Sequence, residues 1–87
     1  MQAPRDVYIK ATEIKEESSK AGQWFAVITT SKGEVTVIVP GHFIDQKKKT
    51  VKGRAIATIG KYLLIDLPNA PIGTSSKVRV AQEYVVA

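Results

Sequence analysis

The alternation of apolar and polar residues with a period of two is the feature that most constrains the fold. β-branched residues dominate the alternating segments, and no window of about eleven residues or more shows the apolar stripe of an amphipathic helix. In the first such segment, residues 6–14, Val7 and Ile9 share one face with Ala11, whereas Tyr8 and Lys10 lie on a wet face. The chain is therefore predicted to be all-β.

Turn residues divide the rest of the chain into further strands. Gly33 can take the positive φ of a tight hairpin turn, and Gly60-Lys61 has the Gly-X pattern of a type II′ turn. Residues 42–53 fit either a loop or a short helical turn. The further strands are expected at 23–30, at 34–39, in a hairpin over 54–67, and as one last strand over 77–86.

Five or six short antiparallel strands must protect their edges, and closure into a small barrel achieves this. The length of 87 residues is enough for one compact domain but not for two. We therefore expect one OB-like barrel over residues 1–87. An SH3-like barrel is the alternative, because strand number does not separate the two topologies.

The excess positive charge lies in the second half of the chain. Residues 1–44 hold five basic and five acidic residues, whereas residues 45–87 hold eight basic and three acidic residues. Between Lys47 and Lys61 there are six basic side chains and no acidic one, and such a field attracts a polyanion. The expected phosphate contacts are Lys10, Lys20, Lys47, Lys48, Lys49, Lys52, Arg54, Lys61 and Arg79.

Aromatic residues recur beside these cations, a mixture typical of proteins that bind single-stranded nucleic acid. Cations follow the phosphates while exposed rings stack on bases, and no recognition helix for double-stranded DNA is evident. Trp24 and Phe25 are adjacent on a strand and must face opposite sides, so one of them is available for stacking. The expected stacking residues are Tyr8, Trp24 and Tyr62.

Catalysis and metal binding are not expected. His42 and Asp45 are close in sequence, but no serine lies in a nucleophile context and no glycine loop has the pattern that cradles phosphate. The chain has no cysteine and one histidine, which leaves no metal-ligand cluster. We expect a non-enzymatic protein without cofactor, metal or small-molecule substrate.

No membrane association is expected, because the chain has no apolar run of spanning length, no signal-like N-terminus and no basic amphipathic helix. The expected location is the cytoplasm, or the host cytoplasm for a viral protein.

Residues 9–39 resemble the opening of small phage and archaeal single-stranded DNA-binding proteins with an OB fold, including the gene five type. Ser19, Lys20, Gly22 and Trp24 occupy the family pattern, with tryptophan where tyrosine is usual. The resemblance covers about a third of the chain. It implies that the loop over residues 18–23 contacts the strand through Lys20 and Trp24. We expect the bound strand to be DNA rather than RNA and binding to be largely without sequence preference.

Residues 53–80 are similar to the latter part of TRAM domains, which are RNA-binding OB-like modules. The matching positions are Gly53 with Ala55, Gly60 with Tyr62, Gly73, and Val78-Arg79-Val80. Both similarities imply the same fold class.

Two further expectations concern partners. The apolar C-terminal residues 84–87 form a strand edge that invites pairing, so a homodimer is predicted. The alternative function is an SH3-like interaction or assembly module whose lysines face an acidic partner protein.

Overall fold

The computed structural model describes residues 4–17 and 22–86. In these ranges the chain forms strands and two short 3₁₀ helices, and no α-helix, so the prediction of an all-β chain is confirmed. The elements are β1 (Arg5–Glu16), β2 (Gln23–Thr30), β3 (Gly33–Pro40), η1 (Gly41–Phe43), β4 (Ile44–Asp45), β5 (Thr50–Ile59), β6 (Tyr62–Asp66), β7 (Lys77–Ala81), η2 (Gln82–Tyr84) and β8 (Val85–Val86).

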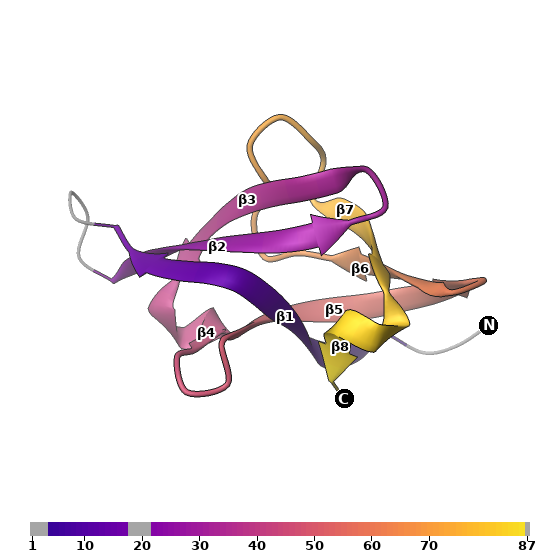
Figure 1. Ribbon diagram of the computed structural model, residues 1–87, viewed down its shortest axis with the longest axis horizontal. Coiled ribbons are helices and arrows are strands. Elements are labelled where there is room, and N and C mark those ends of the chain that lie inside the picture. The colour runs from indigo at the N-terminus through magenta and orange to yellow at the C-terminus, as the bar shows by residue number, and fades with distance from the viewer. Residues whose placement is uncertain (1–3, 18–21, 87) are drawn as a thin grey trace.

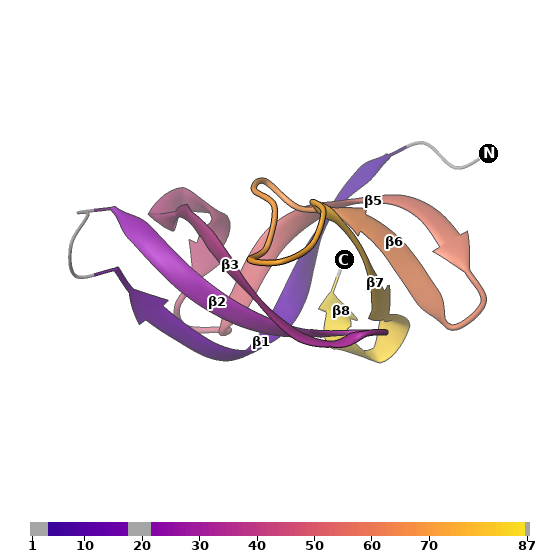
Figure 2. The same ribbon diagram turned by 90° about the horizontal axis from the view of Figure 1, so that it is seen from above.

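The strands form one antiparallel sheet in the order β3-β2-β1-β5-β6-β7, with β4 added to β5 and β8 added to β1. This sheet curls into a half-barrel (Figure 1), with the turn of the β5–β6 hairpin at one end of the molecule and the end of β1 and the start of β2 at the other (Figure 2). The predicted small antiparallel barrel is thus confirmed at the level of fold class. Six strands have five or more residues, and two shorter ones add to the predicted number.

Strand β1 belongs to both halves of the sheet. Its first part pairs with β5, from Arg5 to Lys10, and its last part pairs with β2, from Ala11 to Glu16. The register shifts between Ala11 and Glu13, and such a bulge bends the strand. This bend lets one strand join the two halves of the barrel.

The interior follows the predicted alternation. Val7 and Ile9 of β1 are fully buried, as are Val37 and Val39 of β3, while Ala11 is partly buried. Gly53 is also buried, and a Cβ atom added there would lie 2.7 Å from Ile65 Cγ2. Its missing side chain lets β5 and β6 approach, since no real Cβ tolerates that contact.

The segment after β6 covers the edge of β3. Asn69 Nδ2 donates to Ile38 O at 2.6 Å, and the Ile72 N–H donates to Thr36 O at 2.9 Å. Two carbonyl groups of this edge strand, those of Thr36 and Ile38, therefore have partners within the chain and are not free to pair with another chain.

The prediction of one continuous strand over residues 77–86 is wrong. β7 ends at Ala81, and the 3₁₀ helix η2 turns the chain away from β6 so that β8 can pair with β1. Val85 pairs with Ile9 and Val86 pairs with Tyr8. The apolar segment on which dimerisation was predicted thus includes residues that pair within the chain, and the homodimer stays a prediction.

The segment left open between loop and helical turn contains both. The 3₁₀ helix η1 and the short strand β4 lead into a turn over residues 46–49, and β5 begins at Thr50, before the start expected at residue 54. No helix in the described part of the chain is long and apolar enough to cross a membrane.

Candidate nucleic-acid interface

Tyr8 is an exposed aromatic ring in the middle of the curled sheet. Its neighbours Val7 and Ile9 fill the interior, so the alternation of β1 directs the phenol outward. The Cα partners of Tyr8 are Lys52 on β5 and Val86 on β8. With 40% of its surface exposed, the ring is open to a ligand and lies directly opposite a lysine.

The turn over residues 46–49 is fixed beside β1 and carries three lysines. The Lys48 N–H donates to Asp45 Oδ1 at 3.1 Å, and the Ala11 N–H donates to Lys49 O at 2.9 Å. Lys49 takes φ 58°, a left-handed conformation that closes the turn at a cost of about 1–2 kcal/mol. Two hydrogen bonds therefore hold the lysine turn near Lys10, the neighbour of Ala11.

Two adjoining hollows in the surface share Tyr8 and Asp45. The first, which we call the Thr50 hollow, has a volume of about 520 Å³. The second, the His42 hollow, has a volume of about 640 Å³. The Thr50 hollow is lined by Tyr8, Lys10, Asp45, Lys48, Thr50 and Val86, and the walls of the His42 hollow include Tyr8, His42, Phe43, Asp45, Lys47 and Lys52.

We define the Tyr8 surface as Tyr8 with the four lysines that line these hollows, Lys10, Lys47, Lys48 and Lys52. All five are among the residues predicted to bind nucleic acid. They come from β1, from the lysine turn and from β5, segments that the β1–β5 pairing brings together. Lys49 is exposed in the same turn, but it lines neither hollow.

A second pair of rings, which the sequence analysis did not assign to binding, borders Tyr8. The rings of His42 and Phe43 have centroids 4.2 Å apart with an interplanar angle of 38°. His42 is exposed, because the 3₁₀ turn after Pro40 lifts it out of the sheet. The sequence feature that could have indicated this pair is the position of the two adjacent rings shortly before Lys47, Lys48 and Lys49.

Carboxylates offset some of the positive charge near β5. Lys52 Nζ lies 3.5 Å from Asp6 Oδ2. Arg54 has Asp6 on one side and Asp66 on the other as its Cα partners. Arg54 therefore faces two acidic neighbours, and its charge is less available to a polyanion than those of Lys10, Lys47 and Lys48.

Trp24 lies elsewhere, in the β2–β3 hairpin. It shares the face of the buried residues Ala26 and Ile28, and its side chain is half-buried. A Cβ atom added at Gly41 would lie 3.0 Å from Trp24 Nε1, so the indole packs against this glycine. Phe25 points to the opposite face and is also half-buried. Lys20 and most of the loop predicted to clamp the strand lie outside the described residues.

Lys61 and Tyr62 lie at the turn of the β5–β6 hairpin, the tip that projects to the right in Figure 1. Tyr62 pairs with Ile59 and with Ala81. Its ring is 37% exposed, which is close to the value for Tyr8. Tyr84 is also 37% exposed, so the described residues include three similarly open phenols, and of these only Tyr8 lines hollows together with several lysines.

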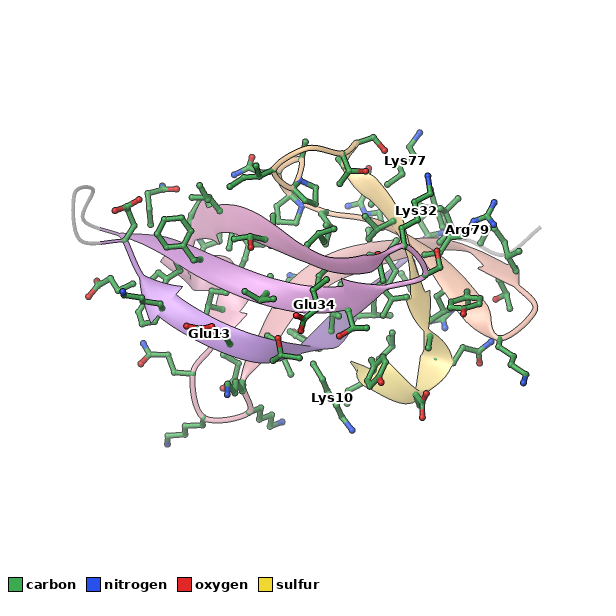
Figure 3. All side chains as sticks on the ribbon, turned by 45° about the horizontal axis from the view of Figure 1, so that its top comes forward. Lys10, Glu13, Lys32, Glu34, Lys77 and Arg79 are labelled. Carbon is green, nitrogen blue, oxygen red and sulfur yellow. The ribbon has the colours of Figure 1, made fainter. Side chains whose placement is uncertain are left out.

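Arg79 belongs to a second basic cluster, formed with Lys32 and Lys77 around a hollow of about 610 Å³. In Figure 3 these three side chains gather at one end of the view, and Glu34 lies between them and Lys10. Ile72 also lines this hollow and is 68% exposed. The second cluster has cations and an aliphatic side chain but no aromatic ring among its lining residues.

The described residues contain no group of three or more His, Cys, Asp or Glu side chains that could hold a metal ion. Comparisons of the chain with models of protein families, with curated proteins and with solved structures found no match.

Proposed function

We propose that this protein binds single-stranded nucleic acid on the Tyr8 surface, with single-stranded DNA as the first ligand to test. The observation that carries the proposal is the exposed ring of Tyr8, which lies among Lys10 and Lys52 on one outward sheet face and Lys48 of the adjoining turn. Rings of this kind stack on bases of any sequence, while lysines follow the phosphates.

The geometry favours a flexible single strand over a duplex. A ring that stacks needs an unpaired base face, and a duplex offers none along its length. The two hollows beside Tyr8 also give room for unstacked bases on a surface whose rim is cationic. Lys10, Lys47 and Lys48 supply the charge, since Lys52 shares its own with Asp6.

The proposal is tested by comparing two tyrosines of similar exposure. Binding of a labelled oligothymidylate of about ten nucleotides is measured by fluorescence anisotropy for the wild type, Tyr8→Ala and Tyr62→Ala. Loss of one stacked base is worth about 1–3 kcal/mol, so we expect Tyr8→Ala to weaken binding between about 5- and 150-fold. We expect Tyr62→Ala to leave Kd within about twofold of wild type, because Tyr62 lies in a different part of the sheet.

Equal losses for the two variants, or no binding by the wild type at low salt, would contradict the proposal. Tight binding of an acidic polypeptide such as polyglutamate, together with no binding of the oligonucleotide, would favour the alternative function as a module for an acidic protein partner.

A further inference from the structure

Thr50 carries a buried hydroxyl without a hydrogen-bond partner. The residue is 3% exposed, and Thr50 Oγ1 is the one buried side-chain polar atom in the described part of the chain for which no partner is present. Leaving such a group unpaired costs about 1–3 kcal/mol. Thr50 also lines the Thr50 hollow, so its unpaired hydroxyl lies just beneath the floor of that hollow, and a rotation of the side chain would bring this donor and acceptor to a ligand there.

A carboxylate lies beside this hydroxyl. Asp45 and Thr50 are Cα partners in the β4–β5 ladder, and side chains of directly opposed residues lie on the same face about 5 Å apart at Cβ. Asp45 Oδ1 accepts the Lys48 N–H, and each carboxylate oxygen can accept two hydrogen bonds, so both oxygens remain able to accept from a ligand. The hollow therefore offers an acceptor from Asp45 and a hydroxyl from Thr50.

The other residues that line the Thr50 hollow give a ligand one apolar surface and one positively charged surface. Tyr8 and Val86, which are Cα partners, supply apolar surface. Lys10 and Lys48 supply positive charge in the same hollow. A carboxylate beside Thr50 repels a phosphate but suits the edge of a nucleobase, whose flanking phosphates would meet the two lysines.

We infer that the Thr50 hollow is a pocket for a single nucleobase and that it prefers guanine. This inference rests on the proposed function and deepens it by adding a base preference to otherwise unspecific binding. Guanine places two adjacent donors, N1–H and N2–H, toward the Asp45 carboxylate, and its O6 can accept the Thr50 hydroxyl. Adenine and cytosine offer one amino group beside a ring acceptor, and thymine offers one donor between two carbonyls that a carboxylate repels.

The test uses oligothymidylates that differ at one central position, which is thymine, guanine or hypoxanthine. A bidentate base contact discriminates by about 1–3 kcal/mol, so we expect wild-type protein to bind the guanine strand between about 5- and 150-fold more tightly than the all-thymine strand. Hypoxanthine keeps N1–H and O6 but lacks the N2 amino group, and we expect an intermediate Kd.

Two nearly isosteric variants separate recognition from stability. Thr50→Val removes the unpaired hydroxyl, so its Tm should equal or exceed that of wild type while the guanine preference falls. Asp45→Asn keeps an oxygen to accept the Lys48 N–H but lacks the carboxylate, and we expect the preference for guanine over thymine to fall to within about twofold. The preference is the ratio of two Kd values for the same variant, so it is measured independently of any change in all-thymine binding, which Asp45→Asn should strengthen by removing a carboxylate beside Lys10 and Lys48.

The outcomes separate this inference from the proposed function. Equal binding of all three strands by wild-type protein, or a guanine preference that survives in both variants, overturns the guanine pocket and leaves the proposed function intact. Failure to bind any strand at low salt overturns both. A guanine preference that both variants lose, with Tm retained, supports the inference.

Discussion

The two basic regions of this molecule differ in what accompanies their charges. The Tyr8 surface combines lysines with an open phenol and a buried hydroxyl that lacks a partner. The second basic cluster, Lys32, Lys77 and Arg79, lies beside two hydroxyl groups that already donate hydrogen bonds within the chain. There, Thr30 Oγ1 donates to Gly33 O at 2.8 Å, and Ser75 Oγ donates to Lys77 O at 3.2 Å.

This difference indicates that positive charge alone does not define a site that binds nucleic acid. A cluster of exposed cations attracts polyanions weakly, and this attraction falls as the salt concentration rises. A ring beside the cations adds a contact that salt does not screen. We therefore expect the Tyr8 surface to bind single-stranded nucleic acid and the second basic cluster to contribute little to the affinity. Four experiments test this difference.

The largest effect is expected from charge reversal. Lys10→Glu with Lys48→Glu removes two phosphate contacts, each worth about 1.5 kcal/mol or more, and should weaken oligothymidylate binding by about 100-fold. The matched control, Lys77→Glu with Arg79→Glu, makes the same change in net charge at the second basic cluster. At about 0.15 M salt, where screening acts over about 8 Å, it should change Kd by less than about threefold. Similar losses in the two double variants would remove the contrast.

A transplanted ring tests whether an aromatic residue is what the second basic cluster lacks. Ile72 is exposed beside Lys77 and Arg79, so Ile72→Tyr places a phenol among cations there. In a Tyr8→Ala background, one stacked base at the low end of the range, about 1 kcal/mol, should improve Kd by about fivefold. No gain in a folded variant would mean that a ring beside cations is not sufficient.

Removing the carboxylate that competes with phosphate for Lys52 should strengthen oligothymidylate binding, and the effect should be smaller than the loss caused by charge reversal. Asp6→Asn releases Lys52 from the ion pair at 3.5 Å. Because exposed ion pairs are worth about 0.2–1 kcal/mol, we expect Kd to improve by between about 1.5- and 5-fold. Asp66→Asn is the control, since Asp66 contacts Ser76 at 3.0 Å and lines neither hollow beside Tyr8. An equal gain from both changes would point to net charge rather than to Lys52.

The salt dependence gives the finest distinction. With three to four phosphates neutralised on the Tyr8 surface, log K should fall against log salt with a slope of roughly −2 to −3. Lys10→Gln should reduce the steepness by about 0.7, and Arg79→Gln should leave it unchanged. A slope near zero for wild-type protein would count against phosphate contacts altogether.

Local alternation was enough to predict that the six longer strands exist, though not all of their bounds, because interior and exterior residues of a curled sheet alternate. It placed Val7 and Ile9 inside and Tyr8 outside, as observed. It did not predict the break at η2, since residues 82–84 continue a β-rich sequence and turn only because β8 pairs with β1. The break therefore depends on pairing with a strand that is distant in the sequence, which local alternation does not reveal.

The sequence was enough to predict which types of residue form the candidate site, but not which of those residues lie together in the structure. The aromatic and basic residues were identified from their proximity along the chain, yet grouping depends on strand pairing. Register places Tyr8 opposite Lys52 and leaves Tyr62 on a distant hairpin. The roles suggested for Asp45 and Thr50 depend on the short β4–β5 ladder, which no periodicity could reveal in two residues.

The most direct test of the Tyr8 surface is a titration of isotope-labelled protein with oligothymidylate, followed through its backbone amide resonances by NMR. We predict that the largest shifts at saturation fall on β1 around Tyr8 and Lys10 and on the segment from Asp45 to Lys52. The resonances of Tyr62, Lys77 and Arg79 should stay close to their free positions. Large shifts confined to the second basic cluster, or none at saturating oligonucleotide, would contradict the account.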